Sequence, residues 1–188
     1  GDLCPGSAER TKKAFNFAGV MTRIDQMATE DATLQINDIA WHDGFPESDN
    51  GTRAFLNFMC RRWFSRLRVV QEVGLAKGTV IAYCGTEYIP WEWLRTTASI
   101  MLLNMELYPP LVQVYCSITK LGNVAIMSTL STFRDGSIKA GGNPARLLAR
   151  LLYITAGIFD QTDCRDRLYA LLGFVKEHGP AHLALRVD

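Results

Sequence analysis

The sequence predicts an α+β fold that is predominantly α-helical and has a small sheet. In several segments apolar residues recur every three or four positions, which is the spacing of an amphipathic helix. Only one segment, TVIAYCG at 79–85, combines β-branched and aromatic residues in the short apolar run of a buried strand. The chain has 188 residues, of which 48% are hydrophobic, so we expect one domain with a substantial core over residues 1–188.

The first predicted helix begins after Ser7, whose hydroxyl can cap it. Its apolar residues recur at helical spacing at Ala14, Phe17, Ala18, Met21, Ile24 and Ala28. The segment from Glu30 to Gly51 is rich in Gly, Pro, Asp and Asn, which predicts a loop. A second helix is expected from Thr52, with its apolar residues at Phe55, Leu56, Phe58 and Met59.

The central segment predicts a third helix from about Arg62 to Ala76, ended by Gly78. On this helix Arg68 and Glu72 form an i,i+4 ion pair. One face of the helix carries Trp63, Leu67, Val70, Val73 and Gly74. The β-branched residues of VVQEV at 69–73 leave a strand as the alternative.

Four later segments are also predicted to be helical. Pro90 fits the first position of a helix that buries Trp91, Leu94, Ala98, Met101, Leu102 and Met105. Another helix is expected over 111–130, and Asn143 with Pro144 reads as the cap and first turn of the next. Asp163 can cap the last helix, whose predicted core residues are Tyr169, Leu171, Leu172 and Phe174.

Composition and residue spacing narrow the classes of function. The formal net charge of +1 argues against a dedicated nucleic-acid binder. Charges interrupt the apolar runs well short of a membrane span, and GDLCPGSAERTKKAF at the start lacks the apolar core of a secretory signal. The five cysteines form no CxxC pair and the three histidines no ligand spacing, so we expect reduced thiols, no metal site and no cofactor. These features predict a cytoplasmic protein without a nucleic-acid or membrane partner.

Two blocks of the sequence carry a family resemblance. RRWFSRLRVVQEVGLAKGTVIAYCG at 61–85, followed by IPWEWL at 89–94, resembles the middle of the fungal heterokaryon incompatibility (HET) domain. That family shows a Trp-Phe-x-Arg segment, then Gln-Glu-Val, a short strand ending in Cys-Gly and a Trp-containing helix. DCRDRLYALLGFV at 163–175 resembles a block that lies downstream in such proteins, Asp-x-Arg-Asp followed by Tyr-Ala-Leu-Leu-Gly. The resemblance covers 54–94 and 163–175.

The departures from the family pattern shape what the resemblance implies. The family's N-terminal blocks, a Ser-Tyr-Val-Trp-Gly strand and a Trp-Ile-Asp…Cys-Ile-Asn-Gln segment, are not found in this chain, and Arg68 stands where relatives often carry Trp. The chain therefore resembles the C-terminal portion of a HET domain plus a downstream segment. HET domains are thought to be related to TIR domains, so the resemblance also allows a partial TIR-like, flavodoxin-like α/β domain.

The resemblance implies a signalling and interaction module in fungal nonself recognition and programmed cell death. Such a module acts through protein partners or self-association. The alternative is a TIR-like hydrolase that cleaves NAD as its substrate and uses Glu72 as the catalytic carboxylate, which would stabilise positive charge on the ribose. Because the N-terminal blocks are not found, we place the non-enzymatic module first.

The candidate ligand or anion site consists of Arg62, Trp63, Arg66 and Gln71. Arginines bind phosphates and a Trp ring can stack on a base, but a solvated helix face and a core Trp are the plainer interpretations. In the downstream block, a structural role is expected for Asp163, Arg165, Asp166 and Tyr169. There we expect Asp163 to cap the helix, Asp166 to pair with an arginine and Tyr169 to lie in the core.

Overall fold

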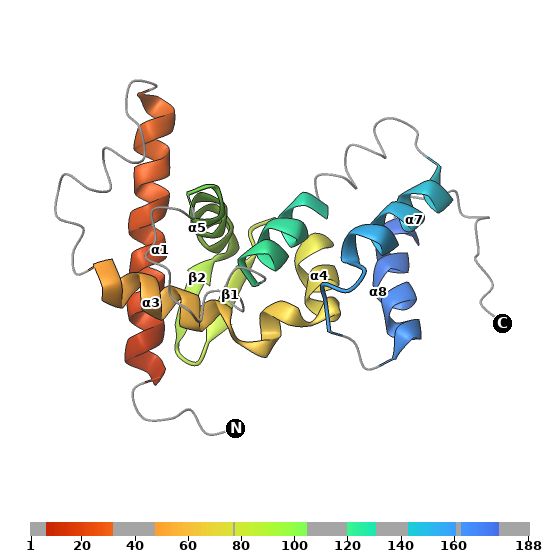
Figure 1. The fold of residues 1–188 in the computed structure, drawn as a ribbon, viewed down its shortest axis with the longest axis horizontal. Coiled ribbons are helices and arrows are strands. Elements are labelled where there is room, and N and C mark those ends of the chain that lie inside the picture. Colours follow the sequence, from red (N-terminus) through yellow and green to blue (C-terminus); the bar gives the residue numbers. More distant parts are fainter. Residues whose placement is uncertain are drawn as a thin grey trace. The chain divides into compact units, whose positions relative to one another are not determined.

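The computed structural model describes residues 7–31, 48–76, 78–104, 120–130, 143–160 and 163–176. These residues are mostly helical and include one two-stranded antiparallel sheet (Figure 1). The predicted α+β class with its small sheet is thereby confirmed. The parallel sheet of a TIR-like domain is not among the described ranges. The chain divides into two compact units, Gly1–Arg61 with Thr79–Val124 and Arg62–Gly78 with Ala125–Asp188. The single domain over 1–188 stays a prediction.

The first unit is built around the long helix α1 (Ser7–Glu30), which packs against α3 (Ser48–Met59) and α5 (Trp91–Leu103). The predicted apolar stripe of α1 is buried from Ala14 to Ile24, and Ala28 is half-buried. Two aromatic pairs, Phe15 with Phe58 and Phe17 with Phe55, join α1 to α3 at ring-centroid distances of 5.0 and 5.8 Å. Helix α3 begins four residues before the predicted Thr52, and residues 32–47 of the predicted loop lie outside the described ranges.

The predicted strand is one arm of a hairpin rather than a buried strand. Strand β1 (Ile81–Cys84) pairs with β2 (Glu87–Pro90), which was not predicted, around a turn in which Gly85 has φ 65°. Side chains of successive residues alternate between the two faces of a strand. One face buries Ile89, and the other exposes Tyr83 beside Tyr88. The prediction of burial was wrong because only one face of the hairpin packs against α1 and α5, which leaves Ile81 and Tyr83 exposed on the other. Pro90 is still in β2, so α5 begins at Trp91.

The second unit contains the 3-10 turn η1 (Arg62–Ser65) and helices α4 (Leu67–Gly74), α7 (Pro144–Thr155) and α8 (Cys164–Lys176). The predicted continuous helix over 62–76 was wrong because Arg66 has extended backbone and forms a parallel bridge with Asp160. In this bridge the Asp160 N–H donates to the Ser65 carbonyl at 2.6 Å. Helix α4 then ends at Gly74 rather than near Gly78.

The later helices largely follow the predictions. The side chain of Asn143 accepts a hydrogen bond from the Ala145 N–H at 2.9 Å, and Pro144 is the first residue of α7. Residues 120–130 are helical, whereas the predicted part at 111–119 lies outside the described ranges, as does Met105. The core of the second unit includes Leu67, Val70, Val73, Leu151, Leu171, Leu172 and Phe174.

Helix α4 packs against α8 through two glycines. A Cβ atom on Gly74 would overlap Cζ of Phe174, whose side chain is fully buried. On α8, a Cβ atom on Gly173 would lie 2.7 Å from the side-chain nitrogen of Gln71. At Gly74 the helices therefore approach as closely as the absence of a side chain permits, whereas at Gly173 the contact is with the flexible end of Gln71.

We expect Gly74→Ala to lower the free energy of unfolding by about 1–2 kcal/mol. Overpacking against the Phe174 ring costs roughly 1–3 kcal/mol, and the helix propensity of Ala recovers up to about 1 kcal/mol. Chemical denaturation monitored by circular dichroism measures the difference. Gly122→Ala is the matched control, because Gly122 is also helical and a Cβ there meets nothing within 4 Å. Equal effects of the two substitutions would contradict the close packing of α4 on α8.

Candidate functional site

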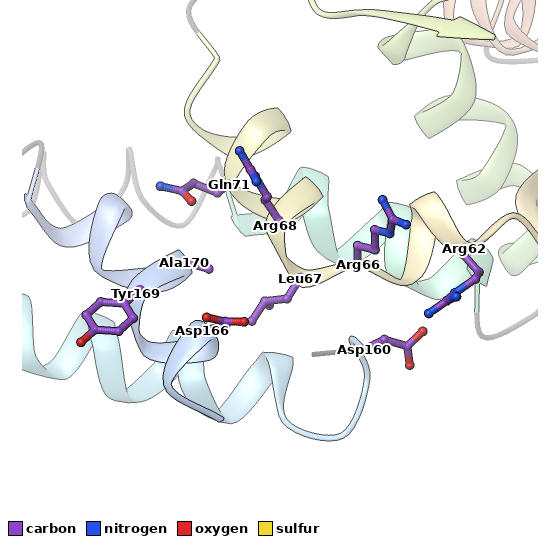
Figure 2. Close-up of a pocket in the computed structure, with 9 residues that line it drawn as sticks. All are labelled: Arg62, Arg66, Leu67, Arg68, Gln71, Asp160, Asp166, Tyr169 and Ala170. Atoms are coloured by element: carbon purple, nitrogen blue, oxygen red, sulfur yellow. The ribbon is translucent and has the colours of Figure 1, made fainter. Parts of the chain in front are cut away.

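A pocket of about 740 Å³ lies within the second unit. This volume falls in the range of small-molecule sites, roughly 300–1,000 Å³. Figure 2 shows its lining residues, which come from η1, from the first turns of α4, from the segment after α7 and from α8. They are Arg62, Arg66, Leu67, Arg68, Gln71, Asp160, Asp166, Tyr169 and Ala170.

Two local features bring these residues together. The backbone bridge between Arg66 and Asp160, supported by a 3.3 Å hydrogen bond from the Leu67 N–H to the Asp160 carbonyl, fixes the segment after α7 beside the start of α4. The close packing of α4 on α8 then places Gln71 over the α8 backbone at Gly173. Residues that are distant in sequence therefore share one pocket.

The pocket carries charges of both signs that do not neutralise one another. Three arginines and two aspartates line it, for a formal charge of 3 − 2 = +1. Arg68 forms an ion pair with Glu72, at 3.5 Å. Neither Arg62 nor Arg66 has an ion-pair partner within 4.0 Å among the described residues, and the same holds for Asp160 and Asp166. In Figure 2 the side chains of Arg66 and Arg68 extend away from the two aspartates.

The predicted anion-site residues divide into two groups. Arg62, Arg66 and Gln71 line the pocket, as the anion-binding hypothesis requires. Trp63 does not line it. The Trp63 ring is half-buried and packs edge-on against Phe64 at a centroid distance of 4.9 Å. Stacking of Trp63 on a ligand in this pocket therefore has no geometric support.

Glu72, the predicted catalytic carboxylate, is also outside the lining. Its side chain is 52% exposed and its partner Arg68 is 86% exposed. Such a pair lies in a high-dielectric environment, where a carboxylate is surrounded by water rather than by a pocket wall. The structure thus places Glu72 as the predicted partner of Arg68.

The downstream block has both structural and pocket roles. Asp163 caps α8 as predicted, because its Oδ1 accepts a hydrogen bond from the Arg165 N–H at 2.9 Å. The Asp163 carboxylate also hydrogen-bonds the Arg165 guanidinium, which raises the pKa of Arg165 above its ordinary value. Asp166 lines the pocket and has no arginine within ion-pairing distance among the described residues, contrary to its predicted pairing. Tyr169 is 53% exposed and lines the pocket, so its placement in the core was wrong.

Sequence reasoning missed Asp160 as a lining residue. Its position depends on the backbone bridge to Arg66, which joins segments more than ninety residues apart and leaves no periodic signal in the sequence. The neighbouring Arg61, by contrast, is engaged within the first unit. Its guanidinium donates hydrogen bonds to Cys84 Sγ and to Thr11 Oγ1, and lies 4.9 Å from the centre of the Phe58 ring.

Two further properties concern metals and membranes. In the described ranges, no three His, Cys, Asp or Glu side chains gather closely enough to hold a metal ion. None of the described helices combines the length and the apolar character that crossing a bilayer requires.

No protein family model, no curated protein and no solved structure gives a match to this chain.

We expect Asp163→Ala to lower the free energy of unfolding by about 1 kcal/mol, because α8 loses the acceptor that satisfies an N-terminal backbone N–H. Asp163→Asn is the control, since the amide oxygen keeps the cap while the exposed charge is removed. Thermal denaturation of the two variants beside the unchanged protein tests this. Similar losses in both variants would show that the charge, and not the cap, is the source of stability.

We expect Glu72→Gln to change the free energy of unfolding by less than about 0.5 kcal/mol, because exposed i,i+4 pairs contribute little. The effect should shrink further in 1 M salt, which screens exposed charges. Denaturant titrations at low and high salt provide the measurement. A loss several times larger, unaffected by salt, would mean that Glu72 has a buried partner.

Proposed function

We propose that the chain is a HET-type signalling and interaction module of fungal nonself recognition, which triggers growth arrest or programmed cell death after engagement at the α4–α8 pocket. The proposal rests on the resemblance of residues 54–94 and 163–175 to HET proteins. It takes the pocket as the place where the module receives its signal.

One structural observation supports this proposal. The two resembling blocks are separated by 68 residues in the chain, at 95–162, yet α4 from the first packs against α8 from the second. Between them they supply eight of the nine lining residues, all except Asp160. A shared pocket gives both blocks a common role, because residues from each would contact the same ligand or partner.

The geometry favours binding over cleavage of NAD by Glu72. A carboxylate that stabilises a developing positive charge acts from a wall of the substrate pocket, where water is excluded. Glu72 is exposed and paired with Arg68, and it does not contribute to the lining. We therefore keep the interaction module as the proposed function.

Induced expression of the chain in a filamentous fungus tests the proposal, with colony growth and cell viability as readouts. We expect the unchanged protein to arrest growth and the double variant R66A/Q71A, which alters the pocket, to lose this effect at equal protein level. Arg146→Ala should behave like the unchanged protein, because Arg146 is an exposed α7 residue outside the pocket lining.

Glu72→Ala separates the two hypotheses in the same strain. The module hypothesis expects this variant to arrest growth and cellular NAD to stay unchanged. Arrest that requires Glu72 and is accompanied by a fall in NAD would favour the hydrolase. Growth that is unaffected by the accumulated, folded protein would contradict the proposed function.

A further inference from the structure

The pocket between α4 and α8 has a cationic side whose positive charge the protein does not neutralise. Arg62 and Arg66 have no ion-pair partner among the described residues, although two aspartates line the same pocket. A guanidinium is planar and offers several N–H donors, which match the oxygens of a phosphate group. An anion bound beside Arg62 and Arg66 would therefore meet donors that the protein itself leaves available.

The start of α4 adds to this cationic side. Arg66, Leu67 and Arg68 are the N-cap and the first two residues of α4, and all three line the pocket. No side chain caps the helix at Arg66. Two N–H groups of this first turn are already bonded, because the Leu67 N–H donates to the Asp160 carbonyl at 3.3 Å and the Val69 N–H to the Arg66 carbonyl at 3.1 Å. The helix dipole still gives this end of α4 a partial positive charge. This contribution has the same sign as the arginines and strengthens the preference for an anionic group.

The two aspartates of the pocket require hydrogen-bond donors from the ligand. An ionised carboxylate only accepts hydrogen bonds, and Asp160 and Asp166 have no cationic partner among the described residues. Gln71 and Tyr169 add an amide and a hydroxyl to the lining. A single ammonium group would form an ion pair with one carboxylate, whereas the hydroxyls of a polyol can donate hydrogen bonds to both carboxylates.

We infer that this pocket binds a phosphorylated sugar, with the phosphate on Arg62 and Arg66 and the sugar hydroxyls donating to Asp160 and Asp166. The ligand is either a free sugar phosphate or the sugar phosphate of a mononucleotide. Both offer a phosphate of about −1.5 to −2 charge at pH 7 beside neutral hydroxyls. This inference rests on the proposed function, for which it names the chemical class of the signal.

Isothermal titration of the purified full chain with ribose 5-phosphate, inorganic phosphate, ribose and O-phosphoethanolamine tests the inference. We expect ribose 5-phosphate to bind at least about tenfold more tightly than inorganic phosphate, because hydroxyl contacts to charged groups are added. Ribose and O-phosphoethanolamine should bind more weakly than ribose 5-phosphate, since each lacks one of the two groups. Adenosine monophosphate distinguishes the sources: tighter binding than ribose 5-phosphate indicates a nucleotide, and weaker binding a free sugar phosphate.

Variants test the roles of the arginines and of the aspartates separately. Arg66→Ala should weaken binding of both ribose 5-phosphate and inorganic phosphate by about tenfold. Asp166→Asn should weaken the binding of ribose 5-phosphate, because a hydroxyl acceptor loses its charge. It should leave the affinity for inorganic phosphate unchanged or raise it, because a negative charge is removed and the arginines remain. Arg146→Ala is the charge-matched control and should change neither. Circular dichroism verifies that each variant is folded, which is expected because all three side chains are exposed.

Three results would overturn the inference. They are the absence of saturable binding by any phosphate probe, equal binding of inorganic phosphate and ribose 5-phosphate, and an equal loss of binding in Arg146→Ala and Arg66→Ala. If any of these binding results is found for a protein that still arrests growth, the inferred ligand is wrong and the proposed function is retained. Binding as expected in a protein that never arrests growth would refute the function and retain the site.

Discussion

The second unit depends on the close contact of α4 with α8. Gly74 leaves room for the buried Phe174 ring, and Gly173 leaves room for the Gln71 side chain. A larger residue at Gly74 would separate the helices, because the Phe174 ring in a packed core has little freedom to move aside, whereas a larger residue at Gly173 would meet the flexible end of Gln71. The same contact that buries Phe174 also holds residues of α4 and α8 on two sides of the pocket, so packing and site geometry share one cause.

The charges of the pocket follow from this arrangement. Helix α4 turns its apolar face, including Val70 and Val73, toward the core, and Arg68 and the N-cap Arg66 remain at the surface. Extended backbone at Arg66 separates η1 from α4 and pairs with Asp160 through main-chain groups only. The Asp160 carboxylate is therefore placed by the backbone rather than by attraction to a guanidinium. Charges of opposite sign can then line one pocket without forming an ion pair.

Much of the fold could be predicted from local sequence patterns, because helix periodicity and helix caps depend on residues that are close in sequence. The stripe of α1, the Asn143 cap of α7 and the Asp163 cap of α8 depend on residues within one or two turns. The break at Arg66, the exposed face of the hairpin and the exposure of Tyr169 depend on partners far away in sequence. For the site, Arg62, Arg66 and Gln71 were predicted by residue type. The place of Asp160 in the lining could not be predicted, because a main-chain bridge to Arg66 positions it.

The arginines of the central segment show why residue type alone does not define a site. Arg61 and Arg62 are adjacent, yet Arg61 is engaged by Cys84, Thr11 and the Phe58 ring in the first unit, and Arg62 lines the pocket of the second. Arg68 differs again, because Glu72 on the next turn of α4 already pairs with it. A guanidinium is available to a ligand only where the fold supplies no competing acceptor. Among these arginines, Arg62 and Arg66 meet that condition within the described ranges. Arg62 is the first residue of η1, and Arg66 is the N-cap of α4.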